Sequence, residues 1–150
     1  MSPATVPQGH QQIVVRAYGV LIHPDEERFL VVGFADGDYR CHRLPGGKVE
    51  YLELSSAAMA RELAEEFGLK VLAPVPIGVL ENTSAEGAGA HDVIFVFAHR
   101  LETPLYPDEG GVFTDEGWTF DVGWRRFDAE TPELYPVGIE EMLPLALAVT

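Results

Sequence analysis

The stretch of sequence that decides the fold is GKVEYLELSSAAMARELAEEFGL, residues 47–69. Its second half contains many good helix formers and has no internal glycine or proline. Gly68 stands where helices commonly end. We therefore expect a helix over Ser55–Phe67, which is the clearest helical pattern in the chain.

Two faces of this helix follow from a rotation of about 100° per residue. The apolar arc consists of Ala57, Ala60, Leu63, Ala64 and Phe67. The acidic arc consists of Glu62, Glu65 and Glu66. We expect the apolar arc to pack on the protein and the acidic arc to face away from it.

A divalent-metal site is one interpretation of the acidic arc, although an acidic helix face is usually just solvated. The arc closely follows Leu44-Pro45-Gly46-Gly47, a loop whose backbone can approach a ligand. Carboxylate oxygens, with a loop carbonyl such as that of Gly47, suit Mg²⁺ or Mn²⁺. Such ions bridge phosphate oxygens and activate water.

The whole stretch resembles the Nudix signature. Gly47 is followed by five residues and then Glu53, and seven more residues lead to the run Arg61-Glu62-Leu63-Ala64-Glu65-Glu66-Phe67-Gly68-Leu69. The resemblance is close over residues 47–69 and looser over about 13–149. It implies an α/β fold, the Nudix α/β/α sandwich with a mixed central sheet, as a single domain over residues 1–150.

The resemblance also implies an activity. The chain would be a Nudix pyrophosphohydrolase that cleaves a diphosphate linkage in a nucleoside diphosphate-linked compound, such as a nucleotide or nucleotide sugar. Glu62, Glu65 and Glu66 would bind Mg²⁺ or Mn²⁺, and we expect Glu62 to be the general base. Glu53 and Arg61 would brace the loop against the helix.

Two positions depart from the common family pattern. Leu52 stands where a glycine often precedes the first glutamate of the signature. Leu54 stands where a serine or threonine often caps the helix, so Ser55 or Ser56 is expected to cap it one residue later. Neither change removes a metal ligand.

Further site residues are expected outside the signature. Arg43 and Arg16 are candidates for binding substrate phosphates beside Gly46 and Gly47, although a pairing of Arg16 with a neighbouring carboxylate is the alternative. A downstream metal ligand is expected at Glu116, with Glu109 and Asp115 as alternatives. His91 and Asp92 are further candidates to face the site, with a plain strand-end pair as the alternative; Trp118, Trp124 and Tyr135 are candidates to stack on a base, with a place in the core as the alternative.

Charge and composition limit the partners. The chain has 24 acidic and 10 basic residues, a formal charge of -14, so we expect a small-molecule partner and no nucleic acid. No apolar run approaches the length of a membrane span, and residues 1–12 do not resemble a signal peptide, so we expect a cytoplasmic protein and no membrane partner. Cys41 is the only cysteine, which excludes an intrachain disulfide.

Strands and loops are expected around the central helix. Strands are predicted at residues 13–22, 29–34, 71–80, 93–98 and 118–127. Loops are predicted at 35–38, 83–90 and 104–116, and a short helix at 139–149. Pro74 and Pro76 confine their strand to an edge or a bend.

Alternatives to hydrolysis remain open. A non-catalytic nucleotide-ligand sensor on the same fold would not need the full set of carboxylates. An isomerase acting on an isoprenoid diphosphate would call for an active-site cysteine, and Cys41 is poorly placed for that. Residues 82–90 carry none of the proline or tyrosine arrays of several subfamilies, so the substrate is not predicted. A homodimer is common in the family, but no residue identifies an interface.

Overall fold

The computed structural model of the chain describes residues 12–36, 39–83 and 90–150. The N-terminal segment 1–11, part of the predicted turn (37–38) and most of the predicted loop 83–90 (84–89) lie outside the described residues. No helix in the described segments combines the length and apolar composition needed to cross a membrane.

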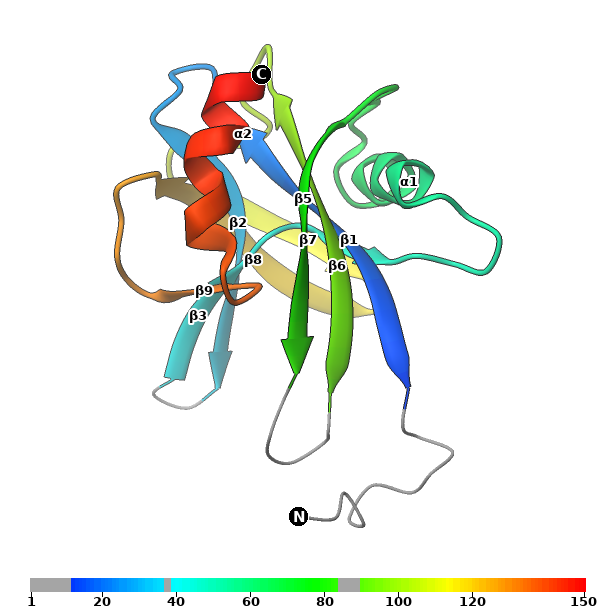
Figure 1. The fold of residues 1–150 in the computed structure, drawn as a ribbon. Helices are drawn as coiled ribbons and strands as arrows, with labels where there is room; N and C mark the ends of the chain where they lie inside the picture. Colours follow the sequence, from blue (N-terminus) through cyan, green and yellow to red (C-terminus); the bar gives the residue numbers. More distant parts are fainter. Residues whose placement is uncertain (1–11, 37–38, 84–89) are drawn as a thin grey trace.

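In the order of the chain, strands precede and follow the first α-helix, and a second α-helix ends the described chain; Figure 1 shows the two helices beside the sheet rather than enclosed by it. The elements in order are β1 (Ile13–Ile22), β2 (Arg28–Asp36), β3 (Tyr39–Arg43), β4 (Gly46–Lys48), α1 (Ser55–Phe67), β5 (Val75–Thr83), β6 (His91–Arg100), β7 (Gly111–Asp115), β8 (Trp118–Arg126), β9 (Glu133–Tyr135), the 3₁₀ helix η2 (Ile139–Met142) and α2 (Leu143–Val149).

The strands of the described residues form one mixed sheet with the main order β5-β6-β1-β2-β3-β9. The longest pairing is parallel, between β1 and β6, and runs from Ile13 opposite His91 to Ile22 opposite Arg100. β8 pairs with β2 and with β7 outside this path. β5 lies at the edge of the sheet, as its prolines predicted.

The sheet opens between β1 and β2, and the glycine loop fills the gap. The register between β1 and β2 contains one residue pair, Ile22 opposite Phe29. Earlier in β1, β4 takes the neighbouring place, with Ala17 opposite Gly47 and Tyr18 opposite Gly46. The hydrogen bonds of antiparallel pairing therefore hold the backbone of Gly46 and Gly47 beside β1.

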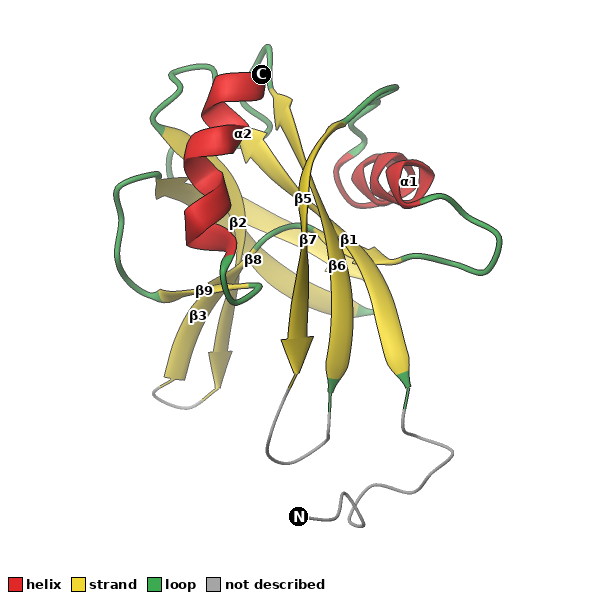
Figure 2. Ribbon diagram, viewed as in Figure 1, coloured by secondary structure: helices red, strands yellow, loops and turns green. Residues whose placement is uncertain are grey.

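Two cores lie on the two faces of the sheet, because successive side chains of a strand point to opposite sides. On β1, Tyr18, Val20 and Ile22 join the core that includes residues of α2. Ala17 and Leu21 join the core that includes residues of α1. The helices thus cover different faces, as Figure 2 shows, and the predicted α/β/α sandwich with a mixed sheet is confirmed.

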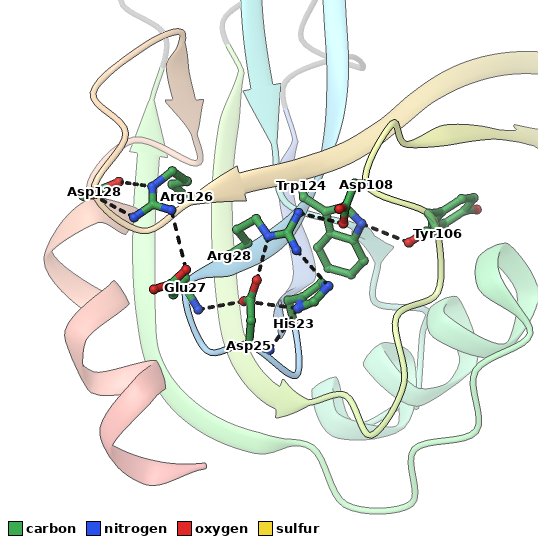
Figure 3. Close-up of polar contacts among 9 residues, drawn as sticks. All are labelled: His23, Asp25, Glu27, Arg28, Tyr106, Asp108, Trp124, Arg126 and Asp128. Carbon is green, nitrogen blue, oxygen red and sulfur yellow. Dashed lines mark hydrogen bonds and ion pairs between the residues drawn. The ribbon is translucent and has the colours of Figure 1, made fainter.

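Polar contacts fix the segment that leads into β7 (Figure 3). Arg28 donates from Nη1 to Oδ1 of Asp108 (3.0 Å) and from Nε to Oδ2 of Asp25 (2.8 Å). The indole N–H of Trp124 donates to the carbonyl of Tyr106 (3.1 Å). These bonds tie residues 106–108 to the sheet just before β7, whose last residues reach the cleft described below.

Several predicted boundaries were wrong. Residues 71–74 are not strand, because β5 begins only at Val75, after Pro74. The predicted loop 104–116 contains β7, which forms a hairpin with β8. The terminal helix does have its predicted bounds, 139–149, and its first turn is the 3₁₀ helix η2. The strands β4 and β9, of three residues each, were not predicted, because they are defined by their partners rather than by local composition.

Candidate active site

Helix α1 has the predicted bounds, and its buried face agrees with the predicted apolar arc only in part: Leu63 is buried and Phe67 packs against the core, as predicted. The buried residues are Ala58, Met59 and Leu63, whereas Ala57 and Ala64 are exposed. The prediction treated three alanines as core residues, although their small side chains bury little apolar surface. The true face is centred near Met59, so Glu62 and Glu66 lie on it or at its border instead of facing away.

The ends of α1 agree only in part with the sequence. Gly68 ends the helix in a left-handed conformation (φ 62°), and its N–H donates to the carbonyl of Ala64, as expected. At the other end, Leu54 is the N-cap residue, and no side chain caps the helix. The predicted cap at Ser55 or Ser56 is therefore wrong, because both serines already lie within the helix.

Arg61 connects the loop to the helix. Its Nε and Nη2 donate to the two carboxylate oxygens of Glu53, at 2.8 and 3.0 Å. Nη2 also donates to the carbonyl of Lys48 (3.0 Å), and Nη1 donates to Oε1 of Glu62 (2.9 Å). A weaker contact of 3.4 Å reaches Glu65. The bidentate bond lowers the pKa of Glu53 to about 2, with help from the N–H of Glu50.

Glu62 and Glu66 form a close pair of acids. Glu66 is largely withdrawn from solvent, and burial is the main cause that raises its pKa far above the usual range. Its hydrogen bond to Glu62 and the negative charge of Glu62 raise that pKa further. Oε2 of Glu66 is the buried side-chain oxygen or nitrogen that lacks a hydrogen-bond partner among the described residues.

The glycine loop approaches this pair so closely that it has no room for side chains. A Cβ on Gly47 would lie 2.5 Å from Oε1 of Glu62 and 2.6 Å from its Cδ. Gly46 has φ 146°, and a Cβ there would overlap the carbonyl oxygen of Ala17. Backbone bonds hold the loop to β1 on both sides, from Gly19 N–H to the Pro45 carbonyl (2.9 Å) and from Val49 N–H to the Val15 carbonyl (2.8 Å).

A cleft of about 800 Å³ extends from these acids, a size suited to a nucleotide-sized ligand. Eight residues predicted for the site line it: Arg16, Arg43, Gly46, Gly47, Arg61, Glu62, Glu65 and Glu116. Two other predicted residues are not among the residues that line it but contact residues that do. Glu53 accepts from Arg61, and Glu66 is hydrogen-bonded to Glu62.

The secondary candidates divide between the cleft and the rest of the protein. Asp92, Asp115 and Tyr135 line the cleft. Trp124 packs edge-on against His23, and Trp118 is exposed in the β7–β8 hairpin. Glu109, His91 and both tryptophans are not among the residues that line the cleft.

The two cations predicted to bind substrate have different surroundings. Arg43 lies with Cζ 5.5 Å from the centre of the Tyr18 ring and has no ion pair within the described residues. Its charge lowers the pKa of Glu66, which places it near the acids. Arg16 instead contacts Asp92, with 3.3 Å from Nε to Oδ1. The alternative interpretation of Arg16, pairing with a neighbouring carboxylate, is therefore present in the structure.

The donor set fits a hard divalent cation. In the described part of the chain, no three acidic, histidine or cysteine side chains already stand together as a metal site. Glu62 and Glu66 do contact each other, however, and Oε2 of Glu66 is buried without a hydrogen-bond partner among the described residues. A cation of the Mg²⁺ or Mn²⁺ type would satisfy this oxygen and separate the two like charges.

Comparison with known proteins agrees with this geometry. The family model described as NUDIX domain matches residues 14–144. The chain belongs to the NUDIX family. A comparison with curated protein sequences gave no significant match.

Solved structures show the same NUDIX fold. The ORF135 protein of E. coli is similar with a TM-score of 0.63 and 19% identity, covering 95% of this chain and 96% of that chain. The MutT NUDIX hydrolase of Burkholderia pseudomallei has a TM-score of 0.61 and 24% identity, with 93% and 99% coverage. The MutT protein of Methanosarcina mazei Go1 has a TM-score of 0.65 and 17% identity, with 91% and 94% coverage. At such identities the likeness concerns the fold.

Some residues of the NUDIX cleft were missed in the sequence. They are Tyr18, Lys48, Glu50, Asn82, Ile94 and Pro136. Tyr18 could have been found, because it is two residues after Arg16 and so shares its side of β1. Asn82 and Pro136 carry no such signal, because they come together only through the pairing of Asn82 with Val137.

Proposed function

We propose that this NUDIX protein is a metal-dependent pyrophosphohydrolase that acts on a nucleoside diphosphate derivative. The observation that carries the proposal is a pair of acids: Glu62 lines the cleft, and Glu66 is hydrogen-bonded to Glu62 and has a buried carboxylate oxygen without a described partner. Family membership supports hydrolysis of a diphosphate linkage. The cleft volume supports a substrate of nucleotide size.

Glu62, Glu65 and Glu66 are the proposed ligands of Mg²⁺ or Mn²⁺, with the carbonyl of Gly47 beside them. When bound, such a cation supplies positive charge to phosphate oxygens and lowers the pKa of water. For the downstream ligand we keep Glu116, which lines the cleft, with Asp115 as the alternative. The negative charge of Asp115 acts on Glu66, so the two lie near each other.

The chain's own residues account for the other requirements of the reaction. A water oxygen forms a new bond to one phosphorus while the bridging P–O bond breaks, and the second phosphate leaves with the bridging oxygen and its electron pair. We assign the water's proton to Glu62. The N–H of Arg61, 2.9 Å from Oε1, orients the Glu62 carboxylate for this role.

Arg43 is the proposed phosphate-binding cation. It lines the cleft near the acids, is held against the Tyr18 ring, and has no ion pair among the described side chains. Its planar fork suits two oxygens of one phosphate. In an acidic protein with a formal charge of -14, such a cation offsets part of the repulsion that an incoming phosphate meets.

A phosphate-release assay tests the proposal. The purified chain with Mg²⁺ or Mn²⁺ would meet nucleoside triphosphates, nucleotide sugars, ADP-ribose, dinucleotide polyphosphates, NADH and coenzyme A. The Glu66→Gln variant removes a proposed ligand, and Glu102→Gln, an exposed acid outside the cleft, is the matched control. We expect a hit that chelator and Glu66→Gln abolish and that Glu102→Gln retains. Nucleotide binding without any product would instead support the sensor.

A further inference from the structure

Two chemically different groups of residues line the cleft. One group is the acids Glu62 and Glu65 with Arg61. The other is the Arg16–Asp92 pair, with Ile94 opposite Arg16 on β6. Because the first group is the proposed site of the metal and the phosphates, the second is available to the remaining part of the substrate.

Arg16 and Asp92 are fixed by the longest strand pairing of the sheet. Arg16 lies on β1 and Asp92 on β6, which pair in parallel from Ile13 opposite His91 onward. Nε of Arg16 contacts Oδ1 of Asp92 at 3.3 Å, and the two side chains are only 26% and 23% exposed. Both line the cleft, so a partly desolvated donor and acceptor stand side by side in it.

This pair is poorly suited to a phosphate. The carboxylate of Asp92 neutralises Arg16 and would repel an anion placed beside it. A neutral group with its own donors and acceptors avoids this repulsion and meets both members of the pair. A planar nucleobase is such a group, because its edge carries both donors and acceptors.

The surrounding wall is braced by the protein itself. The side chain of Asn82 accepts from the N–H of Val137 (2.9 Å) and donates to its carbonyl (3.0 Å). These two bonds hold residues 135–137, including Pro136, against the end of β5. Because its amide is engaged in this way, Asn82 is a positioning residue, and the recognition of a base is left to Arg16 and Asp92.

The pair has a defined hydrogen-bonding pattern. Asp92 only accepts and Arg16 only donates, so acceptors and donors are grouped at opposite ends. Guanine and cytosine also keep their donors and acceptors in separate groups, so that donors can meet Asp92 while an acceptor meets Arg16. Adenine offers an amino group as donor beside a ring nitrogen as acceptor. Uracil presents an N–H between two carbonyls, which places a carbonyl against the carboxylate. Hypoxanthine lacks the second N–H donor that guanine offers.

We propose that Arg16 and Asp92 form a base-recognition site that selects amino-bearing nucleobases over their keto counterparts. This inference rests on the proposed function for the placement of the phosphates. It assigns Asp92 to the amino group of the base and Arg16 to the neighbouring ring acceptor or carbonyl.

Pairs of nucleotides that differ at the base test the proposal. We would measure kcat/KM for GTP against ITP, which differ only in an amino group, and for CTP against UTP and ATP against ITP. Dissociation constants of the corresponding monophosphates, measured calorimetrically without metal, report base recognition independently of catalysis. We expect the amino member of at least one pair to be favoured by about tenfold or more in both measurements.

Variants distinguish recognition by the pair from other causes. Asp92→Asn replaces an acceptor by a group that also donates, so the preference for the amino base should fall to about twofold or reverse. Arg16→Lys retains the charge but loses the fork, and should weaken binding of the preferred base. Asp121→Asn is the matched control, because Asp121 is an exposed strand acid outside the cleft. Thermal unfolding would confirm that each variant is folded.

The outcomes separate the two proposals. Equal values within about twofold for every pair, or a preference unchanged in Asp92→Asn, would overturn the base-recognition site while hydrolysis stands. Metal-independent preference for an amino-bearing monophosphate, without hydrolysis of any triphosphate or other compound of the panel, would support the base-recognition site and overturn the proposed hydrolase.

Discussion

The guanidinium of Arg61 and the carboxylate of Glu53 form a bidentate ion pair, with 2.8 Å from Nε to Oε2 and 3.0 Å from Nη2 to Oε1. Seven residues of sequence lie between them, and the pair joins the segment between β4 and α1 to the helix itself. The same guanidinium holds the carbonyl of Lys48 and the carboxylate of Glu62. Changes at Glu53 should therefore affect the position of Glu62, although Glu53 does not line the cleft.

Acid sensitivity is the first prediction. The pKa of Glu53 falls from 4.5 to about 2 in the folded chain, chiefly through Arg61. A carboxylate with a lowered folded pKa stabilises the fold above its unfolded pKa, and this contribution is lost as the pH falls from about 4.5 to about 2. Urea unfolding at pH 6 and pH 3 should therefore show a smaller loss of stability in Glu53→Gln than in the wild-type chain.

Glu50→Gln is the control for this comparison, because Glu50 is 68% exposed and only 3.9 Å from Arg61 at its nearest approach. It should behave like the wild type over the same pH range. If Glu53→Gln and the wild-type chain lose equal stability between pH 6 and pH 3, the ion pair contributes nothing to acid sensitivity.

The contact between Gly47 and Glu62 leads to the second prediction. An alanine Cβ at position 47 would lie 2.5 Å from Oε1 of Glu62, and the flexible carboxylate is the group that must move. Gly47→Ala should therefore reduce kcat/KM by about 10²-fold while the melting temperature changes little. Gly123→Ala is the matched control, because a Cβ there meets no atom within 4 Å. Full activity in Gly47→Ala would show that Glu62 need not hold this position.

The sequence predicted the site better than the surface on which the helix packs. The bounds of α1, its stop at Gly68 and the grouping of Glu62 with the glycine loop were all accessible from spacing, because they are local. The burial of Glu66 was not accessible. It depends on which side of α1 faces the sheet. That side contains Met59 and Leu63, and the several alanines of the helix did not indicate it.

Contacts between distant strands were equally inaccessible. The Arg16–Asp92 pair joins residues that meet only because β1 and β6 pair in parallel with one particular register. The sequence offered a nearby carboxylate as an alternative partner for Arg16 but could not choose Asp92. β9 and β4, three residues each, were also hidden, since their strand conformation depends on tertiary partners.

Leu52 allows a test of backbone strain. Its φ of 66° lies in the left-handed region, and its side chain is 90% exposed, so little packing compensates. Leu52→Gly should stabilise the chain by about 0.5–1 kcal/mol, which is the left-handed penalty less the extra backbone entropy that glycine loses. Urea unfolding measures this change. Tyr51→Gly, a neighbour that is also 90% exposed but lacks a positive φ, should not be stabilised, and equal effects of both changes would exclude strain as the cause.

Arg43 provides the last prediction. It lines the cleft over the Tyr18 ring and has no ion pair among the described side chains, so its charge is available to substrate. A phosphate held equally in the ground and transition states would make Arg43→Ala raise KM by about 10–100-fold with a smaller fall in kcat. Arg40→Ala, an exposed arginine on the same strand, should leave both constants unchanged. A fall in kcat at constant KM would instead place Arg43 on charge that develops only as the P–O bond breaks, and Arg43→Lys would then restore part of the rate, since a point charge without the fork still stabilises that charge.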